Sequence, residues 1–406
     1  MCMTMSDSRI STPCFRVLHT SDLHLGKRLY HYPRLDEQRS VLERICMIAS
    51  EKRVDAVVIS GDVFDTAQPG AEAVRLFASM LSDLTRRLPG VTVVATGGNH
   101  DSPSRINQMA PVCECIGVHL VGGLEPGVDP LRDFIVEVPG KGWIVAVPYI
   151  NEAMLPEDLY DTLLEEVERR NAALGLPVVL MAHTAVTGCR FRGHENATER
   201  YIGGIDAVSV ETLGRGYDYL ALGHIHMPHA LRGTEGRARY SGTPLAVNFD
   251  EDYAHSVSVV TMRADGSAPE IEEVEIVPER PLVNIPSEGF ARWEDALRGV
   301  LAHDKGLDCY LRVNVEAGDD VPEDADAQVR SVLEGGKTRF CLVNYRRREA
   351  EATPGRRVLT VGEFREKGPL EIAELYVEGS GEMGKFTDEM KEILANLIKE
   401  VEHETE

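Results

Sequence analysis

Carboxylate, amide and imidazole side chains recur together in five short clusters of this 406-residue sequence. A single histidine after a buried strand is more often a hydrogen-bonded structural residue than a ligand, so one cluster alone indicates little. If the residues were only structural, the same residue types would have to occur after five strands by five independent coincidences. We therefore predict one shared functional site, built from Asp22-Leu-His24, Gly61-Asp62-Val-Phe-Asp65, Gly97-Gly-Asn99-His100-Asp101, Ala182-His183-Thr184 and Gly223-His224-Ile-His226.

The donor atoms of these clusters suit a pair of divalent metal ions. They are oxygens and imidazole nitrogens without a thiolate, a set that fits manganese, iron or zinc better than magnesium or calcium. Seven ligands are too many for one ion, so we expect two ions that share a bridging carboxylate. The candidate ligands are Asp22, His24, Asp62, Asn99, His183, His224 and His226.

The charge balance of such a centre favours a phosphoester substrate. Two divalent ions carry four positive charges, and the carboxylates of Asp22 and Asp62 remove two of them when the histidines are neutral. The remaining positive charge can hold a phosphodiester anion and its nucleophile. Two ions about 3.5–4 Å apart lower the pKa of bound water and stabilise both sides of an in-line displacement. The sequence therefore predicts phosphoester hydrolysis.

Short β-branched runs stand just before the clusters and alternate with helical patterns. Apolar residues recur at helical spacing from Leu35 to Ile48 and from Val74 to Leu88. Strands that alternate with helices predict a layered α/β domain, in which reactive residues collect on loops at the carboxyl ends of the strands. The expected strands are residues 15–19, 56–60, 91–95, 177–182 and 217–222.

The pattern changes after residue 270 and predicts two further parts. Residues 277–347 hold alternating helix-like and strand-like stretches, which indicate a small α/β module. Residues 348–406 read as a polar linker and a tail that ends in an amphipathic helix. That helix either docks on a partner or folds onto its own domain. Its apolar face consists of Phe386, Met390, Ile393, Leu394, Leu397, Ile398 and Val401.

Bulk composition indicates a cytoplasmic globular protein. No apolar run approaches the roughly 18 residues of a membrane span, and the first residues lack a signal-peptide pattern. The eight cysteines include no CxxC pair, which suits a reducing compartment. The net charge of −23 opposes nucleic-acid binding, although residues 349–406 alone hold fifteen acidic against seven basic residues.

The ordered clusters DxH, GDxxD, GNHD, H and GHxH resemble the signature of the calcineurin-like metallophosphoesterase superfamily. The resemblance implies a layered α-β-β-α sandwich, with Asp62 bridging the two ions. His100 would face the scissile phosphate and stabilise or protonate the departing oxygen, and Asp101 would orient His100. The first ion would take Asp22, His24, Asp62 and His226, and the second Asp62, Asn99, His183 and His224.

Longer strings around the clusters are similar to the SbcD family. They include His19–Gly26, Gly61–Thr66, Gly98–Pro103, Tyr219–His226 and Arg239–Leu245, followed by Asn248–Glu251. That resemblance implies a DNA nuclease with 3′-to-5′ exonuclease and endonuclease activity, two manganese ions and a homodimer bound to an SbcC-type ATPase subunit. Residues 277–347 would be a capping domain, and residues 348–406 would dock on the ATPase. Asp65 would have a supporting or substrate-side role.

Two other functions remain open at this stage. A metallophosphoesterase acting on a small-molecule phosphodiester or a phosphoprotein would share every metal ligand. A non-catalytic assembly subunit would show a missing ligand or a replaced His100, and neither is seen.

Basic residues near the clusters either face solvent or contact the DNA backbone. These residues are Lys27, Arg28, Arg34, Arg105, Arg190, Arg192 and Arg200.

Overall fold

The computed structural model describes residues 14–190, 201–202, 205–318 and 320–347, with a few isolated positions beyond 370. The contacts between residues divide the chain into two compact units. The first unit is Met1–Val315 with Pro322–Asn344, and the second is Glu316–Val321 with Tyr345–Glu406. Of the predicted amphipathic helix at 386–401, the structure describes only residues 387, 390–391 and 393–394, so the helix stays a prediction.

Two six-stranded sheets form the centre of the first unit. Four strands of each sheet run parallel, and antiparallel strands complete the edges. In spatial order, the first sheet is β16 (Glu270–Glu275), β15 (Ser256–Arg263), β1 (Cys14–Thr20), β4 (Ala56–Ser60), β5 (Thr92–Thr96) and β6 (Val118–Val121). The second is β13 (His229–Ala230), β14 (Ala238–Tyr240), β12 (Tyr219–Gly223), β9 (Val178–His183), β8 (Gly142–Ala146) and β7 (Ile135–Val138).

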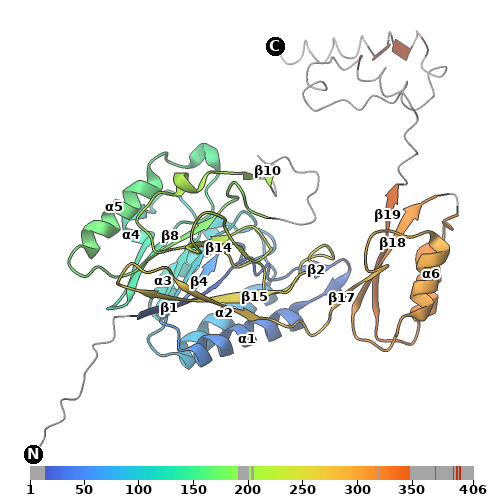
Figure 1. The fold of residues 1–406 in the computed structure, drawn as a ribbon, viewed down its shortest axis with the longest axis horizontal. Helices are drawn as coiled ribbons and strands as arrows, with labels where there is room; N and C mark the ends of the chain where they lie inside the picture. The colour runs from blue at the N-terminus through green and yellow to red at the C-terminus, as the bar shows by residue number, and fades with distance from the viewer. Residues whose placement is uncertain are drawn as a thin grey trace, which may run out of the picture. The chain divides into compact units, whose positions relative to one another are not determined.

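Helices cover the outer face of each sheet, as Figure 1 shows for α1 and α5. The side chains of β4 alternate: Ala56 and Val58 pack toward the second sheet, whereas Val57 and Ile59 pack against helices. Burial on both faces explains why this strand is a continuous apolar run. The first sheet carries α1 (Leu35–Lys52), α2 (Ala71–Arg87) and α3 (Pro103–Glu114), and the second carries α4 (Pro130–Asp133) and α5 (Leu159–Asn171). The expected α-β-β-α sandwich is confirmed.

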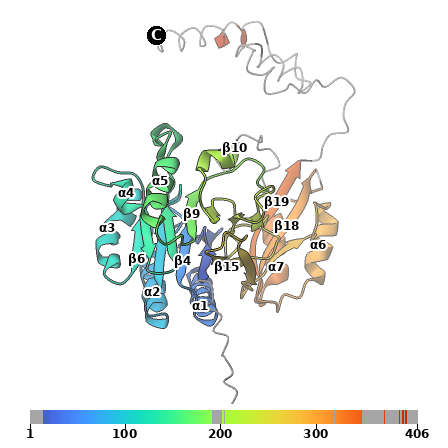
Figure 2. The same cartoon turned by 60° about the vertical axis from the view of Figure 1, so that its left-hand side comes forward.

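A small α/β module follows the two sheets, as predicted. Its three-stranded sheet consists of β17 (Leu282–Ile285), β18 (Tyr310–Ala317) and β19 (Arg339–Arg347). The helices α6 (Trp293–Ala302) and α7 (Ala325–Leu333) pack against each other beside that sheet (Figure 2). Most of this module belongs to the same compact unit as the sandwich, and the boundary at 277–347 stays a prediction.

Short elements complete the described chain. Two small hairpins pair β2 (Arg28–Leu29) with β3 (Tyr32–Pro33) and β10 (Tyr201–Ile202) with β11 (Ile205–Asp206). Single 3₁₀ turns occupy Glu152–Met154 and Val210–Leu213. Within the part of the chain that the structure describes, no helix has the length and apolar character needed to cross a membrane.

Candidate metal centre

The loops at the carboxyl ends of β1, β4, β5, β9 and β12 bring the predicted ligands together. Three overlapping groups of acidic and imidazole residues have ligand atoms within 4.8 Å of one another. Asp22, Asp62 and His183 in these groups are buried, while His226 is half-buried. The groups are Asp22 with His24 and His226, His24 with Asp62 and His100, and Asp22 with Asp62 and His183.

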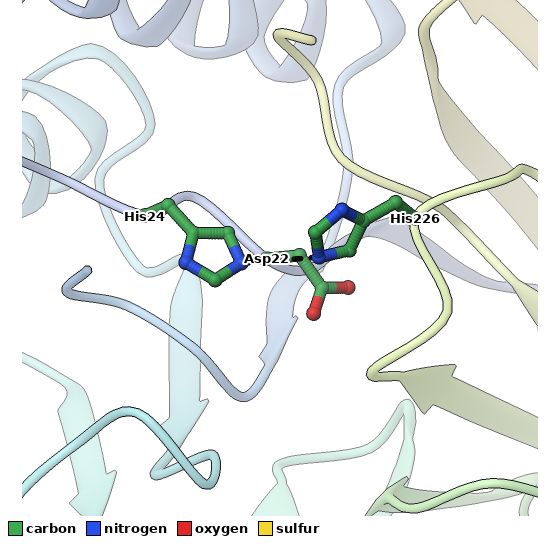
Figure 3. Close-up of side chains that lie close together, drawn as sticks. All are labelled: Asp22, His24 and His226. Atoms are coloured by element: carbon green, nitrogen blue, oxygen red, sulfur yellow. Dashed lines mark hydrogen bonds between the residues drawn. The ribbon is translucent and has the colours of Figure 1, made fainter. Parts of the chain in front are cut away.

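Asp62 lies between two histidines. Its Oδ2 atom is 3.4 Å from Nε2 of His183 and 3.7 Å from Nε2 of His24. The same Nε2 atom of His24 lies 3.2 Å from Nε2 of His226, with Asp22 beside them (Figure 3). A carboxylate in this position is the one that two neighbouring ions can share.

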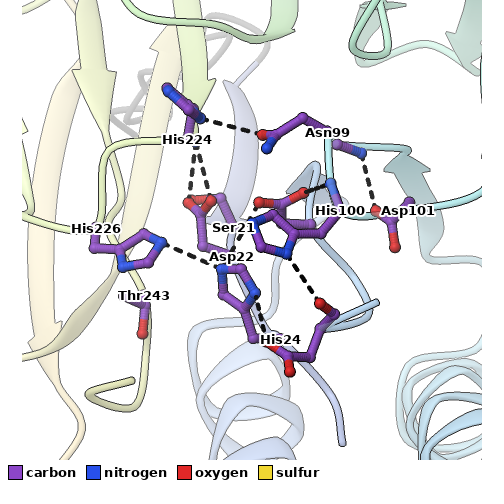
Figure 4. Close-up of polar contacts among 12 residues, drawn as sticks. Ser21, Asp22, His24, Asn99, His100, Asp101, His224, His226 and Thr243 are labelled. Carbon is purple, nitrogen blue, oxygen red and sulfur yellow. Dashed lines mark hydrogen bonds and ion pairs between the residues drawn. The ribbon is translucent and has the colours of Figure 1, made fainter. Parts of the chain in front are cut away.

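Asn99 closes the other end of the cluster. Its Oδ1 atom is 3.1 Å from Nε2 of His183. The same atom is 3.2 Å from Nδ1 of His224, as Figure 4 shows. The backbone N–H of His224 in turn donates to the carboxylate of Asp22, at 3.0 and 3.2 Å from its two oxygens. All seven predicted ligands therefore lie in one continuous cluster.

Hydrogen bonds orient the rings of His183 and His226 so that Nε2 of each faces the cluster. Nδ1 of His183 lies 2.8 Å from the Ser60 carbonyl oxygen, and Nδ1 of His226 lies 2.8 Å from a carboxylate oxygen of Glu251. Both partners accept, so each ring carries its proton on Nδ1 and turns Nε2 inward. With metal–ligand bonds of about 2.1 Å, two ligands of one ion lie roughly 3.0–3.5 Å apart. The separations of 3.1, 3.2 and 3.4 Å fall in this range, and the 3.7 Å between His24 and Asp62 is slightly longer.

Backbone strain marks the same loops. A positive φ is uncommon for residues other than glycine, and it persists only where the surrounding structure enforces it. Four of the seven predicted ligands have one: Asp22 at 53°, His24 at 42°, Asp62 at 49° and His224 at 91°. The fold holds these four side chains in orientations that relaxed strand-to-loop connections would not give.

Two motif glycines allow the loops to approach the ligands closely. A Cβ atom on Gly61 would lie 2.0 Å from Nδ1 of His183, and one on Gly98 would lie 2.1 Å from Oδ1 of Asp62. Either contact is far shorter than van der Waals distance. The glycines of GDxxD and GNHD are therefore required by the space around the ligands.

Comparison with known proteins agrees with this geometry. Residues 15–228 match the calcineurin-like phosphoesterase family, and residues 278–380 match a family described as the Type 5 capsule protein repressor C-terminal domain. The chain is 37% identical over 289 residues to the SbcD subunit of the nuclease SbcCD from Bacillus subtilis (strain 168), covering 66% of this chain and 71% of that protein. The chain belongs to the SbcD family of calcineurin-like phosphoesterases.

Other SbcD relatives show a similar extent of likeness. The protein of the same name from Rhodobacter capsulatus is 33% identical over 68% of this chain and 73% of its own length. The one from Escherichia coli (strain K12) is 27% identical over 66% and 70%, respectively. As a family member, the chain is a metal-dependent phosphoesterase with a two-metal site.

His100 is exposed at the rim of the metal cluster. Its backbone N–H donates to Oδ1 of Asp62 at 2.9 Å, and its Nδ1 lies 2.9 Å from the carbonyl oxygen of Asp65. The ring centre is 4.9 Å from that of His24. Asp65 thus fixes the ring through its backbone, while its side chain lies 3.1 Å from Nζ of Lys27.

Asp101 acts on the backbone that carries His100. Its carboxylate accepts hydrogen bonds from the N–H groups of Val63, Phe64 and Gly98, each at 2.9 Å. Burial, and then the charge of Asp62, raise the pKa of Asp101 to about 6, although these hydrogen bonds oppose the shift. The predicted orientation of His100 by Asp101 is therefore indirect in these contacts, and its catalytic consequence stays a prediction.

The metal-free cluster attracts protons for the same reason that it suits cations. Burial by itself lowers the pKa of His183, but the Asp62 carboxylate, together with Asp22 and the Ser60 carbonyl oxygen, outweighs burial and raises that pKa to about 9. For Asp62, burial favours the neutral form, and His183 followed by His24 and His100 holds the pKa far below its usual range. Without metal, His183 and Asp62 therefore form a buried ion pair.

We expect the affinity for manganese to fall as pH falls. Below about pH 9 the metal-free chain holds an extra proton on His183, and the incoming ion must displace it. One displaced proton predicts a loss of about tenfold in affinity for each pH unit below that pKa. Calorimetric titration at several pH values with buffers of different ionisation heat measures both affinity and released protons. A pH-independent affinity with no proton release would contradict the assignment of His183.

The sequence analysis did not identify Gln38 and Glu251 as residues that support the site. Gln38 fits the apolar spacing of α1, yet its amide donates to the His24 carbonyl oxygen at 2.8 Å and accepts from the N–H of Gly26 at 3.0 Å. Glu251 is buried and binds His226. Glu251 belongs to the Asn248–Glu251 string that resembles the SbcD family, but the string alone does not indicate that Glu251 contacts His226.

The prediction that Arg34 faces solvent or contacts DNA is wrong. Arg34 neither faces solvent nor is available to DNA, because it is 3% exposed and its guanidinium binds Glu37 at 3.0 Å and the carbonyl oxygen of Ala246. A buried arginine with two acceptors is a structural residue. Arg192 and Arg200 lie outside the described residues.

Proposed function

We propose that this chain is the nuclease subunit of a DNA-cutting complex, with 3′-to-5′ exonuclease and endonuclease activity on DNA ends and hairpins. The observation that carries the proposal is the position of Asp62, which lies between two histidines in a cluster that lacks none of its seven expected ligands. The similarity to SbcD proteins, which are named as nucleases, supports DNA as the substrate class.

We assign Asp22, His24 and His226 to the first ion and Asn99, His183 and His224 to the second, with Asp62 shared. When bound, the two ions supply Lewis acidity and an activated water for phosphodiester hydrolysis. The chain keeps these ligands correctly oriented through Ser60 and Glu251, which fix the tautomers of His183 and His226. The absence of thiolates supports manganese as the native metal.

In this mechanism His100 stabilises or protonates the departing oxygen. The Asp65 carbonyl oxygen holds Nδ1 of the ring, so Nε2 is the nitrogen that meets the substrate. At the rim of the site, Nε2 can donate a proton or a hydrogen bond to the departing oxygen. Asp101 keeps the His100 backbone next to Asp62.

We further propose that the chain works in the cytoplasm as a homodimer bound to an SbcC-type ATPase subunit. The relatives are named as one subunit of a nuclease called SbcCD, which supports such an assembly. We retain residues 277–347 as the capping domain and 348–406 as the docking segment. A basic partner would also offset the net charge of −23, which by itself repels DNA.

A nuclease assay on duplex and hairpin DNA, with manganese and with or without SbcC and ATP, tests this function. We expect metal-dependent cutting of short DNA by the chain alone and ATP-dependent cutting in the complex. A His183→Ala preparation, purified in parallel, controls for contaminating nuclease. Hydrolysis of nucleotide monoesters without DNA cutting would favour the small-molecule phosphoesterase, and inactivity on both would favour an assembly subunit.

A further inference from the structure

A buried carboxylate connects the small module to the catalytic domain. Glu37 in the first turn of α1 is 1% exposed and accepts a hydrogen bond of 2.5 Å from the hydroxyl of Tyr310 on β18. Arg280, just before β17, lies 3.4 Å from the same carboxylate oxygen, and Arg34 binds the other oxygen. The Arg34 guanidinium also lies 5.4 Å from the centre of the Tyr310 ring. Tyr310 is therefore central to this junction.

The next residue of α1 carries this connection to a metal ligand. Gln38 follows Glu37 directly and holds the His24 carbonyl oxygen and the Gly26 N–H with its amide group. Both residues belong to one helical turn, whose backbone hydrogen bonds make it rigid. A displacement of Glu37 by the module would therefore move Gln38 and the loop that carries His24.

A second connection reaches His226. Arg312 on β18 donates to the carboxylate of Asp250 at 2.9 Å, and its guanidinium lies 5.2 Å from the centre of the Phe249 ring. Asp250 precedes Glu251, whose carboxylate accepts from Nδ1 of His226 at 2.8 Å and from the N–H of Val247 at 3.1 Å. The same short segment thus contacts the module on one side and a metal ligand on the other.

The two connections share a small apolar cluster and lead to only one of the two proposed ions. Leu29, Phe249, Tyr310 and Cys341 are buried together, so the loops and the module pack against each other. His24 and His226 both belong to the first ion. By contrast, Ser60 of the catalytic domain holds His183 of the second ion.

We infer that the small module positions the first metal site selectively. Tyr310 and Arg312 are positioning residues that act through Glu37–Gln38 on His24 and through Asp250–Glu251 on His226. The inference rests on the proposed two-metal function. Any event that moves the module would change the occupancy of one ion and leave the other in place.

Calorimetric titration of the full chain with manganese tests this inference. Reference variants His226→Ala and His224→Ala identify the binding step of the first and the second ion. We expect Tyr310→Phe, which removes only the hydroxyl, and Asp250→Asn each to weaken the first ion by roughly tenfold, the lower end of the range for residues that support ligands. The affinity of the second ion should stay unchanged.

Matched controls separate positioning from general destabilisation. Tyr160→Phe alters a buried tyrosine of α5, and Arg298→Ala removes a surface ion pair of α6; neither should change either affinity. Asp250 is half-exposed, so Asp250→Asn keeps the test valid if Tyr310→Phe folds poorly. Equal weakening of both ions, or no change in either, would overturn the inference. A wild-type chain that binds a single ion would instead refute the two-metal function.

Discussion

Replacing Asp62 by alanine should abolish phosphodiester hydrolysis and reduce metal content at both sites. The Asp62 carboxylate is the group between His24 and His183, so its removal deprives both ions of a charged ligand. It also leaves the backbone N–H of His100 without its acceptor. Because each bound ion contributes several kcal/mol to catalysis, we expect a rate loss of at least about 10³-fold.

Metal analysis alongside kinetics checks this expectation. Asp62→Asn keeps the shape but removes the charge, so it should resemble Asp62→Ala if charge is what holds the ions. Asp83→Ala, which removes an aspartate of α2 that pairs with Arg86 and Arg87, serves as the matched control. Two fully bound manganese ions with normal turnover in Asp62→Ala would falsify the bridging assignment.

The parallel strands and their ligand loops could be predicted from the sequence because their signal is local. The strand at 56–60 was predicted with the bounds that the structure shows, and 91–95 and 177–182 differ by one residue at each end. These strands are buried on both faces and therefore appear as unbroken apolar runs. Polar residues directly after such runs lie at one edge of the sheets, so the sequence by itself predicts the cluster.

The division into two sheets and the antiparallel strands could not be predicted in the same way. Strand order is set by contacts across hundreds of residues: β1 pairs with β15, whose partner residues lie about 250 positions later. The edge strand β16 (Glu270–Glu275) is largely acidic and exposed, so it lacks the apolar signal. The four-layer architecture is predicted by the resemblance to the calcineurin-like superfamily and not by residue patterns.

The supporting contacts of the site were also beyond sequence patterns. Gln38 lies on the apolar face of its predicted helix and Arg34 in a loop, and neither position indicates the hydrogen bonds that the buried side chain makes. Asp and His adopt a positive φ more often than most other residues, but residue type alone does not indicate that Asp22, His24, Asp62 and His224 do so. Such features depend on how distant loops meet, and only the tertiary structure reveals them.

Replacing His100 by alanine should lower the rate by roughly 10²–10⁴-fold, the usual contribution of a positioned acid or base, while both ions remain bound. The ring is exposed at the rim, and the Asp65 carbonyl oxygen holds its Nδ1. Its removal therefore takes away a substrate-facing group without removing any of the seven assigned ligands. Metal content equal to wild type would support this separation of roles, and loss of an ion would show that His100 is itself a ligand.

The choice of substrate then identifies what His100 does. If Nε2 protonates the departing oxygen, the loss in His100→Ala should be large for DNA, whose alkoxide leaving group needs a proton. It should be much smaller for a nitrophenyl phosphodiester, whose phenolate leaves without one. If His100 instead stabilises charge on the phosphate, the loss should be similar for both substrates, because the charge it meets is the same. A His100→Ala enzyme with equal losses on the two substrates would therefore exclude the general-acid role and retain the electrostatic one.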